Sequence, residues 1–104
     1  MSSDHPALQV AVSAARAAVE AAIPHRAPML LVDEIIEQSA TEIHCRKTFG
    51  TDEFFTQGHF PSYALVPGVI LCECALQSGA ILLAQHAPAA GAVPVATRLD
   101  GVKF

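Results

Sequence analysis

The stretch GVILCECALQSGAILLAQH, from Gly68 to His86, restricts the possible folds more than any other part of the sequence. It contains no proline, and as a helix it would be about 28 Å long. A helix that is apolar almost all round is either buried by other elements or spans a membrane. Glu73, Gln77 and Ser78 lie in its middle, where an ionisable residue would be unfavourable in lipid. We therefore expect a core helix wrapped by a sheet and no membrane association.

The composition favours a single globular domain that finds a partner. The chain has 104 residues, of which 52% are hydrophobic, and a net charge of −4. A chain of this size buries a smaller share of its surface than a larger domain does, so a leftover apolar face is expected to pack on another subunit. The six Lys and Arg residues are scattered from Arg16 to Lys103. Because neutralising phosphates requires clustered positive charge, a nucleic-acid partner is not expected.

An N-terminal helix is predicted over Ala7–Ala22, where alanine is frequent and Pro24 closes the segment. Five apolar residues recur at helical spacing and predict one docked face: Leu8, Val12, Ala15, Val19 and Ile23. The alternative is a frayed leader that packs against nothing.

Strands are expected between and after the two helices. Apolar residues at 29–32 and 35–36 lead to a polar break at 39–41, and apolar and charged residues then alternate from Glu42 to Lys47. This pattern predicts two strands joined by a short turn. Residues 50–68 are rich in Gly, Pro, Asp and Ser and should form a loop, anchored by Phe54, Phe55 and Phe60. The segment VATRLDGVKF, 95–104, is predicted as a final strand.

The three cysteines indicate a reducing, cytoplasmic environment. Cys45, Cys72 and Cys74 are odd in number and lack a disulfide-like spacing. Two residues apart on a helix, Cys72 and Cys74 point to nearly opposite sides and cannot share one metal ion. We therefore interpret them as small buried side chains and expect no zinc site.

Residues with acid–base chemistry gather around the start of the second helix. Glu73 and Gln77 are four residues apart and share one helix face, while Pro67 and Gly68 place the first backbone amides of that helix just upstream. Such amides can stabilise an oxygen that gains negative charge. His59 and a shielded Glu73 are both suited to proton transfer near neutral pH. Together they match what proton abstraction beside a carbonyl requires, although each alone is more often structural.

The segment GHFPSYALVPGVILCECALQSG closely resembles the active-site segment of the β-hydroxyacyl-acyl carrier protein dehydratases of fatty acid synthesis, the FabZ type. IPHRAPMLLVDEIIE is similar to the same family's opening strand motif, and LDGVKF to a mid-chain strand. The resemblance implies an α+β hot-dog fold, in which an antiparallel sheet wraps a long central helix. It divides the chain into an N-terminal helix, 1–22, and a hot-dog domain, 23–104, acting as a homodimer or a trimer of dimers.

The resemblance also implies residue roles. His59 of one subunit takes the α-proton, and Glu73 of the other delivers a proton to the departing hydroxyl, with Gln77 holding Glu73. The Gly68 amide polarises the thioester carbonyl, and Pro67 and Val69 complete the substrate-binding turn. No metal or redox cofactor is implied. The partner is an acyl carrier protein, which could meet one of four basic residues: Arg46, Lys47, Arg98 or Lys103.

Several positions depart from the family pattern. Ser62, Tyr63 and Ala64 replace the usual residues of the loop after His59, and the family continues beyond the strand that matches LDGVKF. We therefore expect Phe104 not to be a natural C-terminus. These departures keep two alternatives open: a catalytically silent hot-dog subunit or acyl-carrier-binding module, and an acyl thioesterase on the same fold.

Overall fold

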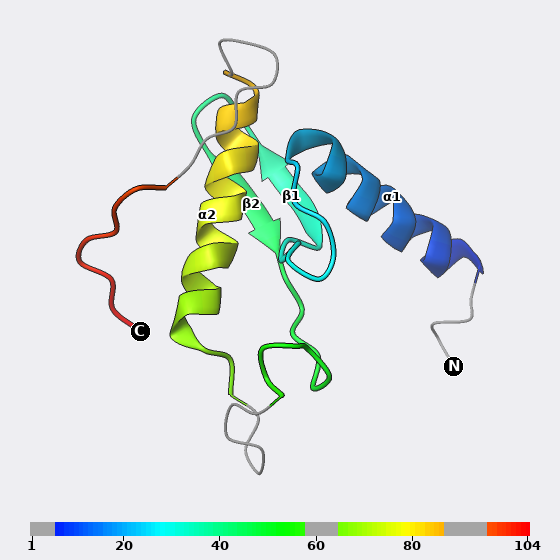
Figure 1. The fold of residues 1–104 in the computed structure, drawn as a ribbon. Coiled ribbons are helices and arrows are strands. Elements are labelled where there is room, and N and C mark those ends of the chain that lie inside the picture. The colour runs from blue at the N-terminus through cyan, green and yellow to red at the C-terminus, as the bar shows by residue number, and fades with distance from the viewer. Residues whose placement is uncertain (1–5, 58–64, 87–95) are drawn as a thin grey trace.

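The computed structural model describes residues 6–57, 65–86 and 96–104 (Figure 1). The chain forms helix α1 (Pro6–Ala22), strand β1 (Glu34–Gln38), strand β2 (Ile43–Arg46) and helix α2 (Gly68–Ala84), in that order. The two strands form an antiparallel pair, against which α1 packs along β1 and α2 along β2. The α+β class expected from the sequence is confirmed.

Helix α1 has the extent that its alanine-rich sequence predicts, but it docks only at its C-terminal end. There the Arg26 guanidinium donates hydrogen bonds to the carbonyl oxygens of Ile23, at 2.9 Å, and Glu20, at 3.1 Å. These bonds satisfy carbonyl groups that a helix end leaves without partners. Val19 is fully buried, whereas Leu8 and Val12 of the same apolar stripe are exposed. Figure 1 shows the reason, since the N-terminal half of α1 projects away from the hairpin.

The hairpin between the helices is closed by a serine. The Ser39 hydroxyl accepts hydrogen bonds from the backbone amides of Thr41 and Glu42, and the Ser39 amide donates to the Glu42 carbonyl. Such side-chain-to-backbone bonds favour a tight turn. The register pairs Ile35 with Cys45 and shifts by one residue at the next position along β1. The predicted pair of strands joined by a short turn is thus confirmed.

The apolar run 29–32 does not form the start of β1, contrary to its sequence pattern. Its backbone is engaged by α2 instead: Gln77 accepts a hydrogen bond from the Leu31 amide and donates one to the Met29 carbonyl. Those groups are therefore not available for a strand ladder. Leu30, Leu31 and Val32 are nevertheless buried. The segment contributes to the core as a loop.

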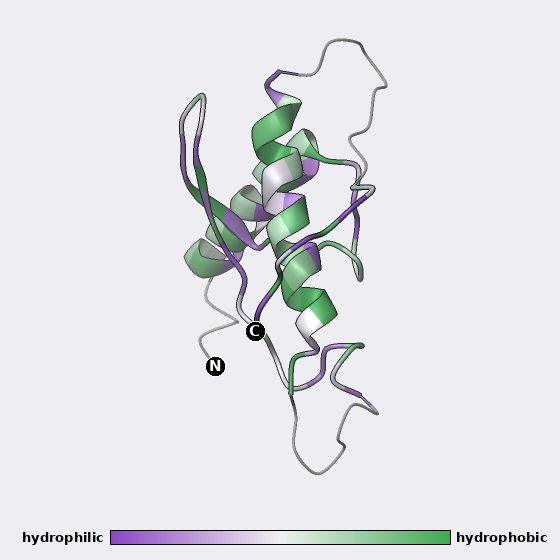
Figure 2. Cartoon of the chain, turned by 90° about the vertical axis from the view of Figure 1, so that its left-hand side faces the viewer, coloured by the Kyte–Doolittle hydropathy of each residue, from purple (hydrophilic) through white to green (hydrophobic). Residues whose placement is uncertain are grey.

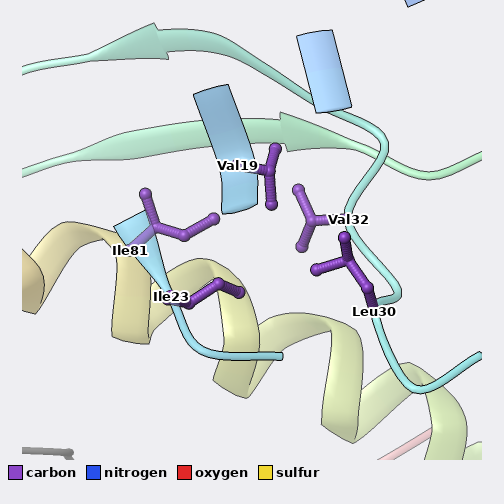
Figure 3. Packing of buried hydrophobic residues seen from close by; sticks show 5 residues of the cluster. All are labelled: Val19, Ile23, Leu30, Val32 and Ile81. Atoms are coloured by element: carbon purple, nitrogen blue, oxygen red, sulfur yellow. The ribbon is translucent and has the colours of Figure 1, made fainter. Parts of the chain in front are cut away.

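The core joins three parts of the chain. Val19 and Ile23 from the end of α1, Leu30 and Val32 from the loop, and Ile81 from α2 form one cluster (Figure 3). All five are less than a tenth exposed. Burying such a side chain fully contributes about 1.5–3 kcal/mol, so this cluster fixes α1 and α2 relative to the hairpin.

Helix α2 has nearly the predicted extent, with Gln85 and His86 forming a turn after it. It is hydrophobic over much of its length (Figure 2). The described residues cover mainly one side of it. Gln77 and Ile81 are its buried residues, while Val69 and Leu83 are more than half exposed. The sheet of the described residues has two strands and does not enclose the helix. Within the same residues, neither helix has both the length and the apolar character that crossing a bilayer requires.

The C-terminal segment differs from its prediction. Residues 96–104 form no strand. They run on the opposite side of α2 from the hairpin, away from the two strands of the described residues (Figure 1). The loop prediction holds for residues 50–57, where Phe55 is buried and packs edge-on against Phe49 and Phe54. Phe60 lies outside the described residues.

Candidate active site

Gln77 is one of two buried polar residues in the described part of the chain. The residue is 1% exposed, and both the oxygen and the nitrogen of its side-chain amide form hydrogen bonds. Oε1 accepts a hydrogen bond from the Leu31 amide at 2.8 Å, and Nε2 donates to the Met29 carbonyl at 2.7 Å and to Glu73 Oε2 at 2.8 Å. A buried amide satisfied in this way is held rigidly, because each lost bond would leave an unpaired polar group. Gln77 therefore fixes both the loop and Glu73 on α2.

Glu73 lies beside Gln77 on the face that their spacing predicts. Its side chain is 30% exposed, so it is half-buried rather than shielded on all sides as expected from its apolar neighbours in the sequence. Its Oε2 receives the Gln77 hydrogen bond and lies 3.8 Å from Nε2 of His25. Its Oε1 has no hydrogen-bond partner within the described part of the chain. Within the described residues, one carboxylate oxygen is thus held by a hydrogen bond and the other is not.

His25 is a site residue that the sequence did not reveal. It follows Pro24 just beyond α1, where the Arg26 guanidinium donates a 2.7 Å hydrogen bond to its carbonyl. Its Nδ1 is buried and has no hydrogen-bond partner among the described residues. Nothing in the sequence connects this histidine with a glutamate 48 residues later. The pairing arises only because the core cluster brings the end of α1 against α2.

An apolar groove of about 800 Å³ runs along α2 from this polar group. On the helix it extends from Glu73 to Leu83, which corresponds to about 15 Å. Small and aliphatic side chains form most of the wall, and a side chain added at Gly79 would meet open space. The groove is lined by Pro24, His25, Glu73, Ala75, Leu76, Gln77, Gly79, Ala80, Leu83 and Ala96.

The other predicted site residues lie at the N-terminus of α2, outside this groove. Pro67 is the N-cap and makes no side-chain cap hydrogen bond, so the first amides of the helix are not occupied by a cap. A Cβ at Gly68 would come within 2.7 Å of the exposed Phe104 ring, so a side chain there would require that ring to move. Val69 is 73% exposed. His59 and the three loop departures at 62–64 lie outside the described residues.

Cys74, next to Glu73, is not set up as a nucleophile. Burial raises the pKa of its thiol, and the Glu73 carboxylate raises it further against the lowering effect of Lys47. A thiol that remains protonated is a poor nucleophile. The described site therefore offers a carboxyl group and an imidazole for chemistry rather than a thiolate.

The fold and this site define an α+β protein with an acid–amide pair at the head of an apolar groove. Residues 17–100 match the model of the ApeP-like family, described as ApeP dehydratase, and the chain belongs to this family. The resemblance to dehydratases inferred from the sequence is thereby confirmed.

The chain is also similar to several curated proteins, each called 3-hydroxyacyl-[acyl-carrier-protein] dehydratase FabZ. It is 39% identical to the protein of Streptococcus gordonii over 87 residues, which cover 84% of this chain and 62% of the relative. It is 39% identical to that of Clostridium perfringens over 82 residues, covering 79% and 59%. For Streptococcus equi subsp. zooepidemicus the identity is 40% over 86 residues, covering 83% and 61%. The chain thus spans about three fifths of the length of these relatives.

Three of the four basic residues considered for a carrier protein are already paired with acids. Arg46 binds Glu34, Lys47 binds Glu53 and Asp33, and Arg98 binds Asp100. The Lys47 hydrogen bond lowers the pKa of the Glu53 carboxyl, which keeps this pair charged. Lys103 has no ion-pair partner within the described ranges.

Proposed function

We propose that this protein removes water from β-hydroxyacyl thioesters carried on acyl carrier protein and forms the trans-2-enoyl product of fatty acid synthesis. The observation that carries the proposal is the Glu73 carboxyl group, which Gln77 holds through one oxygen at the head of an apolar groove. The similarity to proteins called 3-hydroxyacyl-[acyl-carrier-protein] dehydratase supports the same reaction. An acid in this position is suited to protonate a departing hydroxyl group.

The proposed dehydration breaks the Cα–H and Cβ–O bonds of the substrate. His59 takes the proton from Cα, and the electron pair of that C–H bond becomes the Cα–Cβ double bond. The bond between Cβ and oxygen breaks, and the proton of Glu73 joins the leaving hydroxyl to form water. The Gly68 amide donates to the thioester oxygen while negative charge develops there. Pro67 and Val69 shape the turn that presents this amide, and no metal or redox cofactor takes part.

A second copy of the chain completes the proposed site. Within the described residues, helix α2 leaves an apolar face uncovered that includes Val69, Leu71 and Leu83. A face of this kind is typical of a subunit interface. We propose a hot-dog homodimer or trimer of dimers, in which residues 23–104 form the hot-dog domain after the helix 1–22. His59 of one subunit then faces Glu73 of the other.

The substrate and its carrier fit different parts of the molecule. The groove beside Glu73 takes the acyl chain, because its wall is mostly aliphatic. The acyl carrier protein is acidic, and we propose that Lys103 contributes to docking it since the other three candidates have acidic partners. The three free thiols support a reducing, cytoplasmic location.

The test is turnover by the full chain. Purified protein supplied with a β-hydroxyacyl thioester is expected to form the conjugated enoyl thioester, detected by its ultraviolet absorbance. A folded protein that binds acyl carrier protein without turnover would instead identify a silent subunit. Release of free thiol without enoyl product would identify a thioesterase.

Gly79 is expected to set the length of acyl chain that the groove admits. A side chain at this position would extend into open space along the groove wall. Gly79→Leu should therefore lower kcat/KM for a ten-carbon substrate by about tenfold relative to a four-carbon one, since a few displaced methylenes change binding by 1–3 kcal/mol. Ala21→Leu, at an exposed position of α1, is the matched control. An unchanged ratio in Gly79→Leu would place the acyl chain elsewhere.

A further inference from the structure

We propose that His25 is a positioning residue for Glu73: together with Gln77 it holds Oε2, so that the transferable proton of Glu73 resides on Oε1. This inference rests on the proposed dehydratase function and adds a second imidazole to its site. His25 acts on the carboxyl group and not on the substrate.

Two side-chain nitrogens lie near the same oxygen. Gln77 Nε2 donates to Glu73 Oε2 at 2.8 Å, and His25 Nε2 lies 3.8 Å from that atom. Both side chains line the groove with Glu73. A carboxyl group carries one proton, and an oxygen that accepts hydrogen bonds is the less favourable place for it. The proton is therefore directed to Oε1, which has no partner among the described residues.

The tautomer of His25 follows from the surroundings of its two ring nitrogens. Nδ1 is buried and finds no partner in the described ranges, so a proton placed there would be a buried, unpaired donor. Without the proton Nδ1 is a buried, unpaired acceptor, and either state costs about 1–3 kcal/mol. The surroundings of Nε2 therefore decide the tautomer. On Nε2 the same proton faces the Glu73 carboxylate. Neutral His25 therefore presents an N–H donor toward Glu73.

The separation of 3.8 Å leaves room for the contact to tighten. It exceeds the length of a hydrogen bond, and both side chains are about 30% exposed, so neither is locked in place by complete burial. Hydrogen bonds at catalytic sites are commonly long without substrate and shorten in the complex. The ring itself is well placed for this, because Arg26 anchors the backbone at Ile23 and His25.

The experiment compares two substitutions in the full chain. His25→Gln keeps an amide donor near the position of Nε2, whereas His25→Phe keeps a planar ring without any donor. We expect His25→Phe to lower kcat about 10- to 100-fold with KM within twofold of wild type, as for a misplaced catalytic group. His25→Gln is expected to retain kcat within about threefold. His44→Phe, at an exposed histidine of β2, is the matched control and should behave as wild type.

A nitrogen-15 spectrum of the histidine rings tests the tautomer without catalysis. We expect the proton of His25 on Nε2, and the Nε2 resonance to move in Glu73→Gln. Thermal unfolding by circular dichroism identifies any variant that fails to fold. If His25→Phe does not fold, the nitrogen-15 spectrum of the wild type and the kcat of His25→Gln test the inference instead.

Three results would overturn the inference. They are a proton on Nδ1, wild-type kcat in His25→Phe, or a rise in KM at constant kcat, which would make His25 a substrate contact. Absence of turnover in the wild-type chain marks failure of the dehydratase proposal itself, and the catalytic role of His25 falls with it. If the wild-type chain is active and His25→Phe has the same kcat, the role of His25 is wrong and the dehydratase proposal is unaffected.

Discussion

Glu73→Gln is expected to lower kcat about a thousandfold while leaving the protein folded. Positioned general acids contribute about 10²–10⁴-fold to a rate, and a glutamine in place of Glu73 has no proton to give to the departing hydroxyl. The fold should persist, because the new side-chain carbonyl can still accept the hydrogen bond that Gln77 donates. Steady-state kinetics with a β-hydroxyacyl thioester measure the loss, and circular dichroism measures the fold.

A matched substitution separates the role of Glu73 from a general effect of charge. Glu37→Gln removes one carboxylate from the exposed side of β1 and should leave kcat within twofold of wild type. His59→Ala is expected to resemble Glu73→Gln, since the proposed base and acid act in the same step. Wild-type turnover in Glu73→Gln would show that Glu73 is not the general acid.

Gln77→Leu is expected to destabilise the protein by about 2–4 kcal/mol, a large share of the stability of a small domain. Leucine has a similar volume but leaves the Leu31 amide and the Met29 carbonyl without their buried partners. The loop 29–32 should loosen from α2, and thermal unfolding should shift down by roughly 10 °C or more. Because Gln77 also holds Glu73, turnover should fall even at temperatures where the variant is folded.

Gln85→Leu provides the comparison for that loss. Gln85 lies at the end of α2, is exposed, and donates one hydrogen bond to the Ser39 carbonyl. Surface substitutions of this kind change stability by about 0.5 kcal/mol or less. Equal unfolding temperatures for the two variants would contradict the anchoring role assigned to Gln77.

Local patterns predicted the secondary structure well where neighbouring residues decide it. The alanine-rich start and the proline-free apolar stretch define α1 and α2, and Ser39 with its flanking alternation defines the hairpin turn. The same patterns were wrong at 29–32 and 96–104. An apolar run becomes a strand only if a neighbouring strand accepts its backbone hydrogen bonds, and at 29–32 Gln77 takes that place.

The candidate site could be predicted in part from the sequence, because two of its residues are close together in the chain. Glu73 and Gln77 share a helix face, so their four-residue spacing placed them together before the structure did. His25 could not be found this way. Its partner Glu73 lies 48 positions further along the chain, and a pattern of neighbouring residues cannot predict a contact over that separation.

By itself, the sequence determined where the helices and the turn form, and which carboxyl and amide stand side by side on α2, because these depend on contacts within a few residues. Only the tertiary structure decided that the end of α1 delivers His25 to Glu73, that Gln77 ties down the loop, and that one face of α2 remains uncovered. These features arise from packing between segments far apart in the chain, which is fixed by the burial of Val19, Ile23 and Ile81 in one core.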